Sequence, residues 1–99
     1  MVDLLKVFVE IVGTFFFLSV ILNTLTDASI GAIGVAVTLL AGIYFGANTS
    51  GAHFNPVVSF AMFLKNRMEL NLFIAYVLAQ LIGGALAVKF NNYTITRKW

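Results

Sequence analysis

One stretch decides how this chain folds: residues 48–66 read NTSGAHFNPVVSFAMFLKN. A polar loop precedes Pro56, the single proline of the chain, and an apolar segment follows it and ends at Lys65. Proline is favoured at the first position of a helix, where its missing N–H group costs nothing. The pattern therefore predicts a short helix at about 55–65 that begins after a polar loop, with Asn55 as its N-cap.

The composition places this stretch in a membrane protein. The chain has 99 residues, of which 61% are hydrophobic and 10% charged, and its mean hydropathy is +0.99. A soluble domain carries roughly a quarter charged residues. The net charge of +2 comes from scattered basic residues, which argues against a nucleic-acid partner, and the absence of cysteine excludes disulfides and thiolate metal sites. We expect an integral protein of a plasma or inner membrane, with the lipid bilayer as its partner.

Three apolar runs that are each long enough to span a bilayer surround the short helix, at about 4–24, 30–47 and 71–89. The first could also be a signal peptide, but Asp3 lies where a signal peptide has its basic region, Glu10 interrupts the apolar stretch, and no cleavage site follows. A helix of about ten residues reaches only halfway across the membrane, so we expect residues 48–66 to enter and return as a re-entrant segment. The predicted fold class is an all-α membrane protein with three transmembrane helices and one re-entrant half-helix.

Small residues lie at helical spacing within the second and third runs. Gly42 and Gly46 fall on one helical face, and Gly83 and Gly84 share a stripe with the polar residue Gln80. Small residues at such positions let two helix backbones approach closely in lipid. We expect these four glycines to serve helix packing, although glycine is also common in membrane helices without that role.

The re-entrant loop is the candidate functional segment. Non-helical backbone is tolerated within a membrane only where protein buries it or where it lines a water-filled cavity. The loop from Gly51 to Phe54 would present carbonyl oxygens, and the half-helix would direct its free N–H groups and positive dipole end to the midplane. These features predict a pore or a substrate pathway.

The motif at 50–58, Ser-Gly-Ala-His-Phe-Asn-Pro-Val-Val, resembles the first signature loop of the aquaporin and aquaglyceroporin family of major intrinsic proteins. Eight of its nine positions agree with the usual form, and Val57 replaces an alanine. Residues 10–15 resemble the first-helix pattern of the family, and residues 79–83 resemble its third-helix pattern. The resemblance covers residues 1–99 as a single half-repeat, without the second half of a family member.

This resemblance implies roles for individual residues. Asn55 would donate N–H bonds to the passing molecule, and Pro56 would fix the start of the half-helix. The carbonyl groups that would accept hydrogen bonds belong to Gly51, Ala52, His53 and Phe54. In the family, two inverted halves bring their half-helices head to head, and the facing dipoles disfavour cations. Val35 lies where the family has a residue of its outer constriction, and valine there suggests a wider or less polar filter.

Three polar side chains each admit two interpretations. Glu10, inside a span, either accepts backbone hydrogen bonds from the re-entrant loop, as the resemblance suggests, or extends to the membrane interface. Gln80 either lines the pore or pairs with the loop or a neighbouring helix. We favour bracing of the loop for both. His53 is the single histidine and has no other metal ligand at the required spacing, so we expect it to pack within the loop.

The sequence therefore predicts a half-sized channel for passive permeation of water or small neutral solutes such as glycerol. An inverted copy in a homo-oligomer, or a separately encoded second half, would complete the pore. The alternative is a non-conducting membrane subunit, either truncated or modulatory. A secondary transporter is less well supported by a single half-helix, and the sequence predicts no catalytic residues, cofactor or metal.

Overall fold

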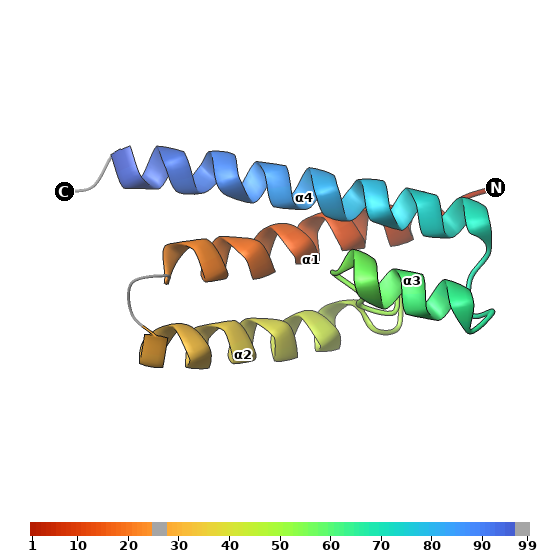
Figure 1. Cartoon of the computed structure of the whole chain (residues 1–99), viewed down its shortest axis with the longest axis horizontal. Helices are drawn as coiled ribbons and strands as arrows, with labels where there is room; N and C mark the ends of the chain where they lie inside the picture. The colour runs from red at the N-terminus through yellow and green to blue at the C-terminus, as the bar shows by residue number, and fades with distance from the viewer. Residues whose placement is uncertain (25–27, 97–99) are drawn as a thin grey trace.

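The computed structural model describes residues 1–24 and 28–96, which form four helices. They are α1 (Leu4–Asn23), α2 (Ala28–Gly46), α3 (Pro56–Leu64) and α4 (Leu70–Thr96). Figure 1 shows α1, α2 and α4 running along the long axis, with α1 and α4 parallel and α2 opposed to them. The short helix α3 lies beside α4 at the end where the chain begins (Figure 1). The described part of the chain is all-α, which confirms the all-helical part of the prediction.

Within the described residues, two helices are long and apolar enough to cross a membrane, over Leu4–Asn23 and Leu70–Thr94. The 20 residues of α1 extend about 30 Å, which matches the thickness of the hydrocarbon core. The apolar helix at Gly31–Gly46 is shorter, and the nine residues of α3 reach about half the core thickness. The fold is consistent with a helical membrane protein, and the number of spans stays a prediction.

Polar side chains are buried in this bundle, and large apolar side chains cover its surface. The buried polar residues are Glu10, Thr14, Ser19, Ser50, Ser59, Gln80 and Asn91. Exposed apolar side chains occur on all four helices, with Phe16, Tyr44, Phe60 and Leu81 as examples. A soluble domain of this size would expose its charged residues and bury its aromatic ones. The observed distribution suits a bundle held together by polar contacts within hydrocarbon.

The helices α1 and α4 pack at very short range. A Cβ added at Gly83 would lie 2.6 Å from the Ile11 carbonyl oxygen and 3.1 Å from Phe15 N, so glycine allows the two backbones to approach. Gly84 differs, because such a Cβ would meet no atom within 4 Å. Consecutive helical residues point about 100° apart, so the two glycines cannot face one partner. The predicted packing role of Gly84 is therefore not seen among the described residues.

The ends of α3 follow from local sequence. Asn55 caps the first turn, and Pro56 occupies the first helical position. At the other end, Asn66 adopts a φ of +59°, Arg67 N donates to Met62 O at 2.9 Å, and Asn66 N donates to Phe63 O at 3.0 Å. These bonds form a Schellman motif, in which asparagine can take the left-handed position. The short helix is thus stopped at both ends by its own residues.

The last helix is longer than its apolar run. The sequence predicts a span that ends at residue 89, whereas α4 continues to Thr96. Hydropathy falls from Lys89 onward, but that segment has no proline or glycine to end the helix. Asn91 is buried, and Thr94 Oγ1 lies 3.4 Å from Asn23 Oδ1 at the end of α1. A polar contact with α1 therefore accompanies the helix beyond the apolar segment.

Candidate functional site

Glu10 of α1 is fully buried beneath the loop that joins α2 to α3. Its Oε1 accepts hydrogen bonds from Phe54 N at 2.7 Å and from Gln80 Nε2 at 2.9 Å. Its Oε2 accepts from Ser50 Oγ at 2.7 Å and from His53 N at 3.1 Å. An ionised carboxylate accepts at both oxygens and donates at neither, and all of these partners are donors. One side chain of α1 thus ties the loop to α4.

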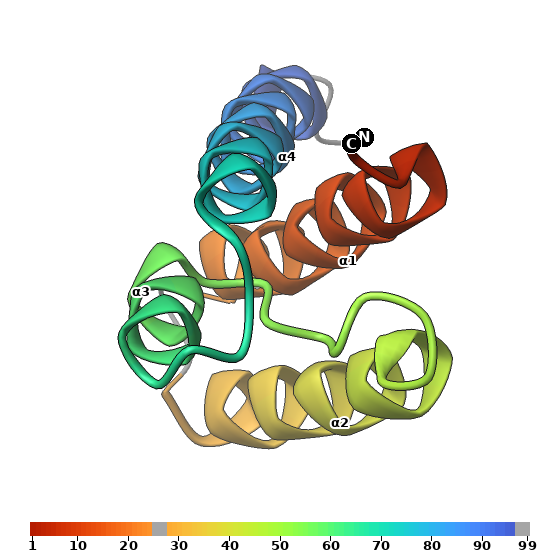
Figure 2. The ribbon, with the colours of Figure 1, turned by 90° about the vertical axis from the view of Figure 1, so that its right-hand side faces the viewer.

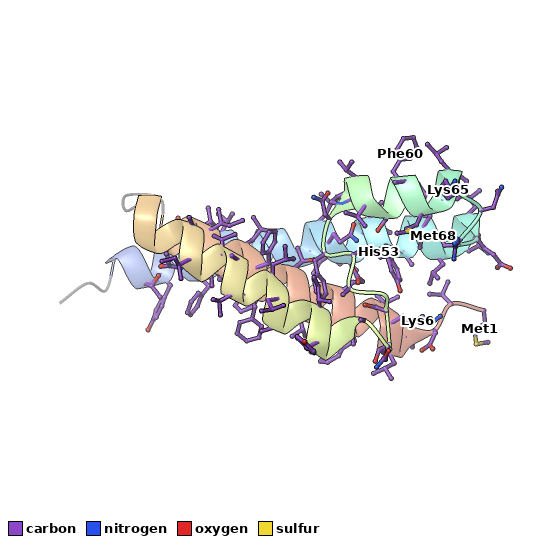
Figure 3. The ribbon with its side chains drawn as sticks, turned by 90° about the horizontal axis from the view of Figure 1, so that it is seen from below. Met1, Lys6, His53, Phe60, Lys65 and Met68 are labelled. Carbon is purple, nitrogen blue, oxygen red and sulfur yellow. The ribbon has the colours of Figure 1, made fainter. Side chains whose placement is uncertain are left out.

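Ser59 extends this network into α3. Its buried Oγ lies 2.8 Å from Gln80 Nε2 and 2.8 Å from His53 Nδ1. Because the amide group of Gln80 donates, Ser59 Oγ accepts there and can donate its own hydrogen to His53 Nδ1. This arrangement fits the tautomer of His53 that carries its proton on Nε2. Figure 3 shows His53 on the loop between α2 and α3.

Tyr76 of α4 holds the start of the loop. Its hydroxyl donates to Ser50 O at 2.5 Å, and its ring meets the His53 ring edge-on with centroids 5.0 Å apart. Ser50 Oγ also accepts from Ala52 N at 3.1 Å. Ser50 therefore receives contacts from α4 and from its own loop while it donates to Glu10.

The loop backbone is strained at two residues other than glycine. Ala52 and Phe54 both have a φ of +54°, and Gly51 has a φ of +89°. The left-handed region costs a residue with a side chain about 1–2 kcal/mol. Such strain persists only where the surrounding structure determines it, and it is common at functional sites. Here the carboxylate of Glu10 accepts from the backbone N–H of Phe54 and offsets part of this cost.

Asn55 caps α3 and keeps its amide group available. Its Oδ1 accepts from Val57 N at 2.8 Å, which assigns the oxygen to the helix. Its NH₂ group has no hydrogen-bond partner among residues 1–24 and 28–96, and the side chain is exposed. Pro56 removes one N–H group from the first turn and fixes its φ angle. The result is a donor held in one orientation at the start of a helix.

Carbonyl oxygens lie next to this donor along the chain. In the described part of the chain no hydrogen bond ends on the oxygens of residues 51–54, whereas Ser50 O and Asn55 O are both occupied. A fixed donor followed by unoccupied acceptors can bind a molecule that both donates and accepts, such as water or a polyol. The chemistry offered here is hydrogen-bond exchange.

Two glycines of α2 face the aromatic ring of Phe54. The sequence had predicted that they face the backbone of another helix. A Cβ at Gly42 would lie 3.0 Å from Phe54 Cε2, and a Cβ at Gly46 would lie 3.1 Å from Phe54 Cζ. These residues therefore make room for an aromatic side chain of the loop. Val35, the predicted filter residue, is half-buried on α2.

Two apolar cavities flank α1, and neither contains the donor. A cleft of about 360 Å³ lies between α1 and α2, and a groove of about 650 Å³ lies between α1 and α4. Asn55 lines neither of them, and its side chain is exposed. The single chain thus presents the donor on an open face.

Sequence analysis missed three members of the network. Ser59 is the one polar residue of α3, and a lone hydroxyl in an apolar half-helix was the available signal. Ser50 belongs to the quoted motif, and Tyr76 shares a helical stripe with Gln80, but neither pattern reveals its partner. Among the described residues no group of three His, Cys, Asp or Glu side chains could hold a metal ion.

Known proteins resemble this chain over most of its length. The sequence model of the family described as major intrinsic protein matches residues 23–98. Aquaporin NIP1-2 of Arabidopsis thaliana is 36% identical over 91 residues, which cover 83% of this chain and 31% of that protein. Glycerol uptake facilitator protein-like 6 of Lactiplantibacillus plantarum is 34% identical and Aquaporin Z of Photorhabdus laumondii 33%, each over 83% of this chain and 40% of the relative. No solved structure matches at a significant level.

The shared region contains the loop and the capped half-helix described above. The chain spans only 31–40% of the length of these relatives, so they extend well beyond the aligned part. The family match nevertheless covers most of this chain, including Asn55, Ser59 and Gln80. The chain therefore belongs to the major intrinsic protein family, whose members are membrane channels and not enzymes.

Proposed function

We propose that this chain is a half-sized, aquaporin-like channel subunit through which water or small neutral solutes such as glycerol permeate passively. The observation that carries the proposal is Asn55: its oxygen caps α3, while within the described residues its NH₂ group donates no hydrogen bond and the carbonyl oxygens of residues 51–54 before it accept none. In this proposal residues 1–99 form one half-repeat. The helices α1, α2 and α4 cross the membrane, and residues 48–66 enter it and return.

A permeating molecule would exchange hydrogen bonds with the loop. It would accept from Asn55 Nδ2 and donate to a carbonyl oxygen of residues 51–54, and these bonds would replace the ones it made with bulk water. The N-terminus of α3 adds a positive dipole end that disfavours a cation at the same place. Glu10 and Gln80 act as bracing residues, because their bonds hold donor and acceptors before the molecule arrives.

A second half-repeat would close the pathway. The side chain of Asn55 is exposed, and an open polar face is unfavourable in hydrocarbon. The chain also spans 31% of Aquaporin NIP1-2 and 40% of Aquaporin Z. An inverted second copy, or a separately encoded second half, would cover the polar face and supply the other wall of the pore.

The expected pore is permissive. Val35 is aliphatic where water-selective members of the family usually have an aromatic residue. In an inverted homodimer, Val58 would stand in both copies where the second family loop carries its filter arginine. Without the filter arginine and the aromatic residue, we expect the pore to exclude solutes larger than water only weakly.

Reconstitution of the purified chain into lipid vesicles tests the proposal. Stopped-flow light scattering should show faster osmotic shrinkage than in protein-free vesicles, and an inward glycerol gradient should produce faster swelling. Permeability equal to that of protein-free vesicles for both solutes would contradict the channel and favour a non-conducting modulatory subunit.

The basic residues also predict an unusual topology. With the usual topology of the family, Lys6, Lys65 and Arg67 would lie on the cytoplasmic side of the membrane. Lys89, Arg97 and Lys98 would lie on the outer side, and the last two are outside the described residues. Figure 3 shows Lys6 and Lys65 at the end of the molecule where Met1 lies. Orientation in the membrane follows the Lys/Arg asymmetry of short loops. Three residues on each side give no asymmetry, so we expect insertion in both orientations.

Cysteine labelling in intact cells measures this orientation, since the chain has no native cysteine. Two variants, Glu69→Cys and Trp99→Cys, place single thiols in the turn before α4 and at the last residue. With dual insertion, a membrane-impermeant maleimide should label about half of each variant. Complete labelling of one variant with none of the other would exclude the inverted homodimer and leave a separate second half.

A further inference from the structure

The ring of Phe54 is wedged between two helices. Figure 2 shows the loop before α3 running between α1 and α2, and the Phe54 side chain is only 3% exposed. A Cβ at Gly13 of α1 would overlap ring atoms Cε1 and Cζ and lie 2.5 Å from Cδ1. On the opposite edge, a Cβ at Gly42 of α2 would lie 3.0 Å from Cε2. Together with Gly46 at the tip of the ring, these residues form a glycine socket.

The backbone conformation of Phe54 links the fit of its ring in the socket to the position of the next residue, Asn55. Phe54 has a φ of +54°, which a bulky side chain rarely adopts. Its N–H group donates to Glu10, and its carbonyl carbon is bonded to the nitrogen of Asn55. The carboxylate thus fixes the main chain while the socket fixes the side chain. Both constraints act on the residue directly before the donor.

We propose that Phe54 is a positioning residue: the glycine socket holds its ring, and the ring keeps the loop in the conformation that presents the Asn55 amide. The inference rests on the proposed function, in which Asn55 is the donor. A ring that served only to fill space would need contact with no more than one helix. Here opposite edges face α1 and α2, so the separation of these two helices determines where the loop lies.

A set of glycine variants tests the socket in the full chain. Gly13→Ala should speed amide hydrogen exchange in the peptide 50–55 by about tenfold and lower water permeability by about tenfold, because the added methyl overlaps the ring. Gly42→Ala should have a smaller effect, since its contact is longer. Gly84→Ala is the matched control and should change neither measurement, because its methyl meets no neighbour within 4 Å. Adding Phe54→Leu to Gly13→Ala removes the two ring atoms that overlap and should restore both measurements in part.

The two measurements separate this inference from the proposed function. Faster exchange without loss of permeability would overturn the positioning role, and so would Gly13→Ala behaving like Gly84→Ala. If Gly13→Ala does not fold, Gly42→Ala and Phe54→Leu carry the same comparison, and unchanged exchange and permeability in both would overturn the inference. A wild-type chain that does not conduct would contradict the proposed function and with it the donor role, while exchange would still decide whether the ring holds the loop.

Discussion

Replacing Asn55 by leucine is expected to reduce the water permeability of vesicles to that of protein-free vesicles. Leucine is close in size to asparagine but has no N–H group, so a permeating molecule would meet an apolar side chain at the start of α3. The variant also loses the bond from Val57 N to Asn55 Oδ1. Loss of such an N-cap costs about 1 kcal/mol. Stopped-flow measurements at equal protein content per vesicle give the result.

Two further variants separate the donor from the cap. Asn55→Asp keeps an oxygen for Val57 N but has no donor, so we expect an intact helix and lost permeability. Asn55→Ser offers a hydroxyl that both accepts and donates, so part of the permeability should remain. Circular dichroism and thermal stability in detergent show whether α3 and the bundle persist. Wild-type permeability in Asn55→Asp would refute the donor role of Asn55.

The start of α3 could be predicted because its determinants are local. Asn55 and Pro56 are adjacent, and each acts on the first turn of the helix that follows. A carboxylate in an apolar run has few acceptable environments, so the sequence left two interpretations for Glu10: a buried position beneath the loop or a position at the membrane interface. The structure has it buried. The choice of bracing over the interface depended on family resemblance.

Contacts between distant residues could not be predicted from spacing. Ser59 and Gln80 are 21 positions apart, and Ser50 and Tyr76 are 26 apart, so no helical or strand period relates them. The glycine motif of α2 indicated a close neighbour but not its nature. A ring from the loop and the backbone of another helix both require the same absence of side chains. Which of them fills the space depends on the path of the loop.

The end of α4 was missed for a different reason. The predicted boundary at residue 89 followed hydropathy, which reports the environment of a segment and not its backbone conformation. The chain remains helical to Thr96, and Asn91 within this last part of the helix is buried. The polar residues after position 89 therefore did not indicate where α4 ends.

Glu10 offers the second large effect, in this case on stability. The variant Glu10→Ala leaves the donors of Ser50, His53, Phe54 and Gln80 without their acceptor. A buried donor without a partner costs about 1–3 kcal/mol, so we expect loss of the folded loop and poor recovery of the protein.

Glu10→Gln makes the test gentler, because the side chain keeps its shape. One amide oxygen can still accept, but the new NH₂ group must face two donors in a buried site. We expect the melting temperature in detergent to fall by roughly 10 °C and the peptide 50–55 to exchange its amides faster. Glu69→Gln is the matched control, since it removes the same charge from an exposed residue in the turn before α4. Equal melting temperatures for the two variants would mean that the carboxylate of Glu10 does not stabilise the loop, and the bracing assigned to it would have to be withdrawn.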